Sequence, residues 1–260
     1  MASDPKTLSQ QRFGQFAQSY VTSAPHAQGS DLDRLLEIAQ PQADWQALDV
    51  ATGGGHTALK FAPHVAWVVA SDITPNMLEA ARAFITGQGE ANVSYELADA
   101  EQLPFEDERF DLVTCRIAPH HFADAAGFVR EAARVLAPGG RLLVEDHLLP
   151  DAAEAAPVVE AYEKLRDPSH HRAYSEAEWR AMFARAGLAV THTERVEKRL
   201  GFVDWVERQG CAPEVVAELV RMLREASPAV AAWLDPRDVG APQATFASHH
   251  LIIAGQKEAR

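Results

Sequence analysis

A glycine turn is the first feature of this chain whose residue types could hold a ligand. Residues 53–55 are all glycine; they follow the apolar segment 47–50 and precede a helical pattern that begins at Thr57. Glycine permits a tight turn and lets a ligand approach the backbone closely. Because the first N–H groups of a helix bind polar or anionic groups, we expect a binding site where this strand ends.

Aspartates end the next two apolar segments. Asp72 ends segment 65–72 and lies roughly 20 residues beyond the turn, where an acid can bind a ribose. Asp99 lies near the end of segment 93–100. A carboxylate accepts hydrogen bonds from two hydroxyl groups at once, which suits a ribose diol. Each aspartate could instead cap the helix that follows it, and this structural alternative remains open.

Helical patterns alternate with the apolar segments. Two further apolar segments lie at 110–115 and 141–146, and helical patterns cover 75–84 and 125–136. Strands that alternate with helices indicate a parallel sheet with helices on both faces. An amphipathic helix at 31–39 is expected to pack beside the first strand.

The second half of the chain is predicted to complete the same sheet. A capping pattern predicts a helix over 175–186, and apolar patterns predict strands over 188–200 and 245–256. Segments 151–175 and 201–243 are expected to form a helical cover or insertion, with two helices in the second segment.

Composition fits a single domain over residues 1–260. A count of two cysteines argues against a disulfide framework and against a cysteine-rich metal site. A net charge of −13 disfavours general nucleic-acid binding, which needs a basic face. The sequence shows neither a signal-peptide pattern nor an apolar run near the roughly 20 residues that span a bilayer. We therefore expect a cytoplasmic monomer or homodimer that binds no nucleic acid.

Several motifs, in this order, resemble those of the class I S-adenosylmethionine-dependent methyltransferases, in the bacterial branch near the quinone and menaquinone C-methyltransferases. The matching segments are 49–55, 71–78, 98–105, 110–113 and 135–142. The resemblance implies a Rossmann-like sheet of seven strands, mostly parallel, with helices on both faces and one antiparallel strand near the C-terminus. It also implies S-adenosylmethionine as the methyl donor and a small molecule as the acceptor.

The resemblance assigns the methionine half of the cofactor to the glycine turn. Ala51, Gly53 and Gly55 would contact it, and Asp49 would help to hold its amino group. For Asp49, a structural acid that only orients the turn is an open alternative. The family's first turn glycine is Ala51 here, from which we expect an adjusted turn that still binds. Arg116 would hold the cofactor carboxylate or an anionic substrate, unless it is a surface arginine.

The nucleoside half is assigned to the next two motifs. By resemblance, Asp72 would bind the ribose hydroxyls, with Ile73 and Met77 beside the adenine. Asp99 would accept a hydrogen bond from the adenine amino group, and Ala100 would lie next to it.

Related enzymes also close an N-terminal segment over the cofactor, here residues 1–30, so Tyr20 is a candidate contact. His26 and the histidine pairs at 120–121 and 170–171 raise the alternative of a zinc or iron site. No spacing typical of metal ligands supports that alternative, and we expect no metal.

Histidines are the candidate catalytic residues. His121 and His120 follow the fourth strand, where ligands bind in open α/β sheets, and His171 lies in a loop expected to cover the site. A histidine near its ordinary pKa of about 6.5 can take a proton from an acidic carbon or hydroxyl group. The quinone C-methyltransferases have an Arg-Asn pair in place of His120 and His121, so the resemblance does not extend to a quinone acceptor. The alternative is that these histidines cap a helix or face solvent.

These residues predict a methyl transfer to a carbon or oxygen atom of a small molecule. Two alternatives remain: a protein that binds S-adenosylmethionine without transferring its methyl group, and a NAD-dependent oxidoreductase. The glycine turn lacks the GxGxxG spacing that the second alternative requires. A fold of this kind identifies the donor better than the acceptor.

Overall fold

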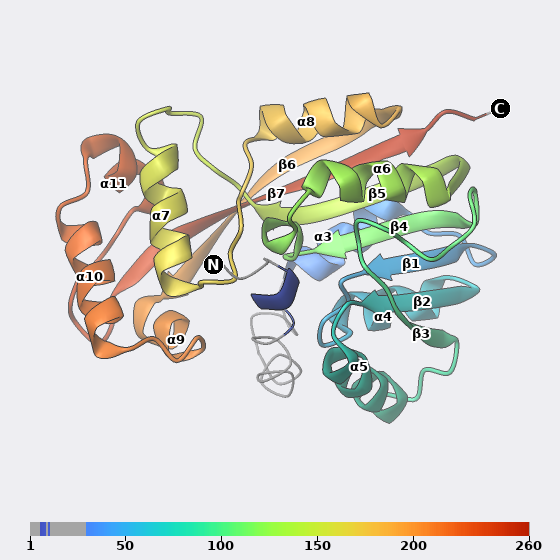
Figure 1. Ribbon diagram of the computed structural model, residues 1–260, viewed down its shortest axis with the longest axis horizontal. Helices are drawn as coiled ribbons and strands as arrows, with labels where there is room; N and C mark the ends of the chain where they lie inside the picture. Colours follow the sequence, from blue (N-terminus) through green and yellow to red (C-terminus); the bar gives the residue numbers. More distant parts are fainter. Residues whose placement is uncertain (1–5, 9, 11–29, 260) are drawn as a thin grey trace.

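A seven-stranded sheet forms the centre of the structure, a computed structural model that describes residues 6–8, 10 and 30–259 (Figure 1). The strand order is β3-β2-β1-β4-β5-β7-β6, and β7 runs antiparallel to both of its neighbours while the other strands are parallel. The strands are β1 (Gln46–Val50), β2 (Trp67–Asp72), β3 (Val93–Leu97), β4 (Phe110–Arg116), β5 (Leu136–His147), β6 (Leu188–Gly201) and β7 (Thr245–Lys257). The predicted fold class is confirmed, including the antiparallel strand.

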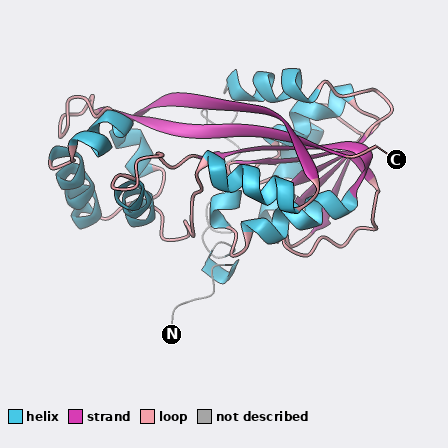
Figure 2. Cartoon of the chain, turned by 90° about the horizontal axis from the view of Figure 1, so that it is seen from above, coloured by secondary structure: helices cyan, strands magenta, loops and turns pink. Residues whose placement is uncertain are grey.

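Helices cover both faces of the sheet (Figure 2). One face packs against α3 (Ser30–Ala39), α4 (His56–Phe61) and α5 (Pro75–Gly87), through buried side chains such as Leu35, Phe61 and Ile85. The other face packs against α6 (Ala125–Val135) and α8 (Glu176–Arg185), through side chains that include Phe128 and Trp179. A capping box between Ser175 and Glu178 begins α8, as the sequence predicted. Two short 3-10 helices, η1 (Ala62–His64) and η2 (Pro119–His121), complete these layers.

Strand β3 ends earlier than the sequence pattern indicated. Its last residue is Leu97, and the following segment 98–102 forms a loop that is closed by a bridge between Asp99 and Gln102. β3 is an edge strand, and its last two residues, Glu96 and Leu97, are exposed.

The strands β6 and β7 extend past the rest of the sheet and carry a helical cap, seen at the left of Figure 1. The cap consists of α7 (Ala156–Arg166), α9 (Phe202–Glu207), α10 (Pro213–Arg224) and α11 (Pro228–Leu234). It has its own buried cluster, in which the rings of Tyr162 and Trp205 stack at a centroid distance of 5.0 Å and Phe246 of β7 packs against both. The cap helices lie within the segments 151–175 and 201–243; their role as a cover for the site stays a prediction.

Helix α11 was not predicted from the sequence. Segment 201–243 was expected to hold two helices, and α11 is a third. A proline at the first position of a helix is favourable, and the Ser227 hydroxyl accepts a hydrogen bond from Val230 N–H. Among the described residues, no helix has the length and apolar composition needed to cross a membrane.

Candidate functional site

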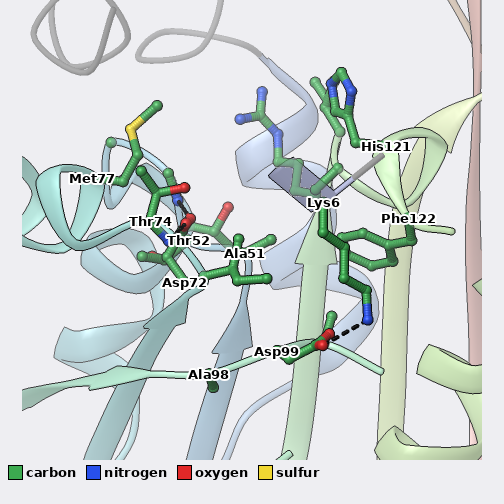
Figure 3. A pocket seen from close by; sticks show the side chains of 18 of the residues that line it. Lys6, Ala51, Thr52, Asp72, Thr74, Met77, Ala98, Asp99, His121 and Phe122 are labelled. Atoms are coloured by element: carbon green, nitrogen blue, oxygen red, sulfur yellow. Dashed lines mark hydrogen bonds and ion pairs between the residues drawn. The ribbon is translucent and has the colours of Figure 1, made fainter. Parts of the chain in front are cut away.

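A cavity opens where β1, β2, β3 and β4 end, at the carboxyl edge of the sheet (Figure 3). Its empty space, including the part open to solvent, is ≈ 1020 Å³. It is lined by Lys6, Ala51, Thr52, Gly53, Gly54, His56, Thr57, Asp72, Ile73, Thr74, Met77, Ala98, Asp99, Ala100, Glu101, Arg116, Ile117, Ala118, His121 and Phe122.

The glycine turn divides its residues between the cavity and the core. Gly53 has φ +52°, and a Cβ there would meet no atom within 4 Å, so its backbone is open to a ligand. Gly55 does not line the cavity; a Cβ there would lie 2.9 Å from Ile85 Cδ1. The absence of a side chain at Gly55 lets the turn pack against α5, and its contact with the cofactor stays a prediction.

Two non-glycine residues at the cavity adopt left-handed backbone conformations. Ala51 has φ +53° and Ile117 has φ +52°. This conformation is rare for alanine and rarer for a β-branched residue, and it costs on the order of 1–2 kcal/mol. Both residues line the cavity, and strained backbone of this kind concentrates at functional sites.

Asp49 lies beneath the turn and not in the cavity lining. Its carboxylate accepts hydrogen bonds from the hydroxyls of Thr52 (2.6 Å) and Thr114 (2.7 Å), and the residue is only 2% exposed. Burial raises the pKa of Asp49 to about 6, although both hydroxyls oppose the shift. The arrangement supports the alternative of an acid that orients the turn, and a direct contact between Asp49 and a ligand stays a prediction.

Asp72 does line the cavity. One carboxylate oxygen accepts the N–H of Gly53 at 3.0 Å and the other accepts the N–H of Thr74 at 2.8 Å. Each oxygen can accept a further hydrogen bond, so the side chain can orient the turn and still bind a ribose diol. Burial raises the pKa of Asp72, while these N–H donors lower it. Ile73 and Met77 line the same part of the cavity, as predicted for a nucleoside.

Asp99 and Ala100 also line the cavity, but Asp99 already has a cationic partner. Lys6 Nζ lies 2.6 Å from Asp99 Oδ2 and 2.8 Å from Glu101 Oε2 (Figure 3). Gln10 Nε2 donates to the carbonyl of Ile73 at 3.0 Å. The N-terminal segment thus reaches the cavity at the acid that was assigned to adenine. Sequence patterns gave no signal for Lys6, and Tyr20 lies outside the described residues.

Arg116 is not a surface residue. Its guanidinium pairs with the buried carboxylates of Asp31 and Glu145, and Lys198 joins both of these acids at 3.0 and 2.7 Å. Because these two acids already neutralise Arg116, its predicted role with a carboxylate ligand stays a prediction, even though it lines the cavity.

Of the three candidate histidines, His121 lines the cavity. His120 lies behind it, with Nδ1 at 2.6 Å from Asp146 Oδ1. His171 does not line the cavity either; its main-chain N–H donates to the His120 carbonyl at 2.8 Å, while the neighbouring His170 is buried against His120. Catalytic roles for His120 and His171 stay predictions; Asp146 holds the ring of His120, and neither residue lines the cavity.

Three further histidines join His120 and His121 in a buried cluster that the sequence analysis missed. Ring centroids of neighbouring members lie between 4.0 and 5.0 Å apart, for the pairs 120–121, 120–147, 120–170 and 147–250. His147 and His250 meet because β5 and β7 pair in that register, which no local pattern reveals. No group of three or more histidine, cysteine or acidic residues in the described part of the chain could hold a metal ion.

Burial determines the charge of His121. It lowers the pKa of His121 to about 4, with Asp167 and the Ser169 carbonyl acting in the opposite direction. The imidazole is therefore neutral near pH 7 and can accept a proton.

Comparison with known proteins identifies relatives over most of the chain. A family model described as a methyltransferase domain matches residues 48–144. An uncharacterised methyltransferase of Bacillus subtilis, YcgJ, is 37% identical over 215 residues, which cover 83% of this chain and 85% of that protein. The crystal structure of the B. subtilis YcgJ protein matches with a TM-score of 0.85 and 34% identity, over 89% of this chain and 99% of that chain.

Two other similarities are narrower. A ubiquinone/menaquinone biosynthesis C-methyltransferase of Pseudomonas fluorescens is 36% identical over 131 residues, 49% of this chain and 51% of that protein. A geranyl diphosphate C-methyltransferase of Streptomyces coelicolor, solved with S-adenosyl-L-homocysteine, has a TM-score of 0.63 at 11% identity, over 88% of this chain and 78% of that chain, and shares the fold alone.

Proposed function

Because this chain belongs to the class I S-adenosylmethionine-dependent methyltransferases, we propose that it methylates a carbon or oxygen atom of a small molecule and that His121 is the base. The observation that carries the proposal is the position of His121 in the cavity wall, with a carbonyl oxygen at its Nδ1. Membership in this family excludes the oxidoreductase alternative.

The described residues fit the donor. The open backbone at Gly53 suits the methionine half, and Asp72 suits the ribose. The apolar side chains of Ile73 and Met77 suit the adenine. S-adenosylmethionine supplies a methyl group already activated by a positively charged sulfur, so the protein has to align the acceptor, exclude water and remove a proton.

His121 would supply the proton transfer. Its Nε2 lone pair takes the proton of an acidic C–H or O–H group of the acceptor. The electron pair left on that carbon or oxygen forms the new bond to the methyl carbon. The methyl–sulfur bond breaks, and its electron pair stays on sulfur. Burial keeps the base form of His121 populated throughout the neutral range, and because a pKa of about 4 makes it a weaker base than free imidazole, the role requires an acceptor whose own proton is acidic.

The test is acceptor-dependent formation of S-adenosylhomocysteine. The purified chain is incubated with S-adenosylmethionine and a panel of phenols, enols and carbon acids, and methylated products are identified by mass spectrometry. We expect one class of acidic acceptor to give both products in equal amounts. Binding of S-adenosylmethionine without turnover on any acceptor, or transfer only to amines, would overturn the proposal.

A further inference from the structure

A loop at the base of the cap holds His121 in the cavity wall. The loop, residues 167–170, follows α7, and the carbonyl oxygen of Ser169 lies 2.9 Å from His121 Nδ1. Asp167 fixes the loop, because its Oδ1 accepts hydrogen bonds from the N–H of Ser169 at 2.9 Å and from the Ser169 hydroxyl at 2.6 Å.

These contacts assign the tautomer of His121. A carbonyl oxygen can only accept a hydrogen bond, so Nδ1 carries the hydrogen that it shares with Ser169. The Ser169 hydroxyl also lies 3.3 Å from Nδ1, but its hydrogen is already directed to Asp167. In a neutral imidazole the lone pair then belongs to Nε2, the nitrogen that a base needs.

Asp167 is in turn held by the cap. Gln209, just after α9, donates its Nε2 hydrogen to Asp167 Oδ2 at 2.7 Å, and both residues are buried. A chain of hydrogen bonds therefore runs from the cap through Asp167 and Ser169 to His121, which lines the cavity.

We propose that Asp167, Ser169 and Gln209 are positioning residues that fix the tautomer and ring orientation of His121, so that the helical cap assembles the base. The use of that base rests on the proposed function, whereas the tautomer is a property of the protein alone. The proposal restricts the acceptor to molecules with a proton that Nε2 can take.

Other charged groups also face His121 and enter its titration. Asp167 favours the protonated ring, and Arg166 and His170 oppose it. The ring of His120 lies 4.0 Å away, centroid to centroid. Removal of Asp167 changes both the charge near His121 and the hydrogen bonds of the loop. The variant Asp167→Asn separates these effects, because it removes the charge and keeps a hydrogen-bond acceptor.

The experiment uses the full chain with 15N-labelled histidine and long-range proton–nitrogen NMR, which distinguishes the two neutral tautomers without any acceptor. We expect the Nδ1–H form for His121 in the wild type. Asp167→Ala should mix the two forms in comparable amounts, and Asp167→Asn should keep the Nδ1–H form, because its amide oxygen can still accept from Ser169 and Gln209 can rotate. Glu163→Gln, which changes a buried acid one turn earlier in α7, is the matched control and should leave the tautomer unchanged.

Three results would overturn the proposal: an Nε2–H tautomer in the wild type, an unchanged tautomer in Asp167→Ala, or mixed tautomers in the Glu163→Gln control. If Asp167→Ala does not fold, Ser169→Ala serves in its place, since it removes the hydroxyl contact and leaves the carbonyl. We expect a smaller admixture of the second tautomer there, and its absence counts against the proposal.

Activity supplies an independent readout once an acceptor is known. Asp167→Ala should lower kcat about 10- to 100-fold and leave the KM for S-adenosylmethionine unchanged. In the His121→Ala background the same substitution should have no further effect on kcat, because a positioning residue acts only through the base; a further loss there would show a structural role instead. Failure to find any methylated product overturns the proposed function but leaves the tautomer result standing.

Discussion

One wall of the cavity is formed by the glycine turn and residues 72–77, and the facing wall by η2 with the loop 167–170 behind it. On the first wall, carboxylate oxygens accept backbone N–H groups, as Asp72 does from Gly53 and Thr74. On the second wall, an imidazole is held by a carbonyl that a distant loop supplies. The first arrangement fixes the shape of the wall that we propose for the methyl donor. The second depends on how another part of the chain docks, so it is where the acceptor and the reaction can vary.

Replacement of His121 should show the largest difference between an effect on turnover and an effect on donor binding. We expect His121→Ala to lower turnover by roughly 10²–10⁴-fold, the usual contribution of a positioned base, and to leave the affinity for S-adenosylmethionine nearly unchanged. Steady-state kinetics and calorimetry measure the two quantities. His64→Ala, an exposed histidine, is the control. If His121→Ala weakened donor binding as much as turnover, the two walls would not have separate roles.

Replacement of Asp72 should have the opposite pattern. We expect Asp72→Ala to weaken S-adenosylmethionine binding by about 1.5–3 kcal/mol, because a charged hydrogen-bond acceptor is lost and the turn loses its support at Gly53. Calorimetry with the exposed Glu79→Ala as the control measures this change. An unchanged dissociation constant would reduce Asp72 to a residue that only begins α5.

Stability should depend on pH with opposite signs at Asp49 and His121. The pKa of Asp49 rises to about 6 on folding, so the native state binds more protons than the unfolded state between pH 3.8 and 6. The contribution of Asp49 to the free energy of unfolding therefore decreases as the pH rises through that window. The pKa of His121 falls from 6.5 to about 4 on folding, so the unfolded state binds more protons than the native state between these pH values. The contribution of His121 to the free energy of unfolding therefore decreases as the pH falls through that range.

Denaturant unfolding between pH 4 and 7 tests these signs. The His121→Ala variant should lose less stability than the wild type on acidification from pH 6.5, by up to about 1.4 kcal/mol per pH unit. Asp49→Asn should lack the stability that the wild type gains on acidification below pH 6. If the free energy of unfolding changed equally with pH in all three proteins, neither Asp49 nor His121 would have the shifted pKa described above.

The smallest effect is expected at Lys6. Lys6→Met removes the cation from Asp99 and Glu101, and we expect donor affinity to rise by about 0.5–1 kcal/mol because a partly exposed ion pair no longer competes for Asp99. Calorimetry at low and high salt checks this, since salt should narrow the difference. Lys60→Met, which affects a distant pair with Asp33, is the control. Weaker binding in Lys6→Met would mean that Lys6 is itself part of the donor wall.

The sequence was informative where the site is built from neighbouring residues. The turn at 51–55 and Asp72 follow strands whose apolar pattern locates them at one edge of a parallel sheet. The sequence did not show which residues of the turn face the core. Gly55 packs against Ile85, and Asp49 accepts a hydrogen bond from Thr114; both partners lie on other elements.

The second wall was only partly predictable for the same physical reason. His121 was a candidate because it follows a central strand, but His147 and His250 meet only through the register of β5 with β7. The sequence analysis named His171 as a candidate, whereas His170 is the residue of this pair that is buried beside His120. Which of the two histidines faces the interior depends on the path of an irregular loop, and the sequence pattern does not determine that path.

The position of β7 has a consequence for the order in which the chain is made. Strand β6 lies at the edge of the sheet and, within the described chain, its sheet partner is β7, which follows it by more than forty residues of cap. During synthesis β6 and the cap helices therefore leave the ribosome before the strand that connects β6 to β5 has been made. The buried cluster of the cap is completed only when β7 has been made, because Phe246 of β7 packs against Tyr162 and Trp205.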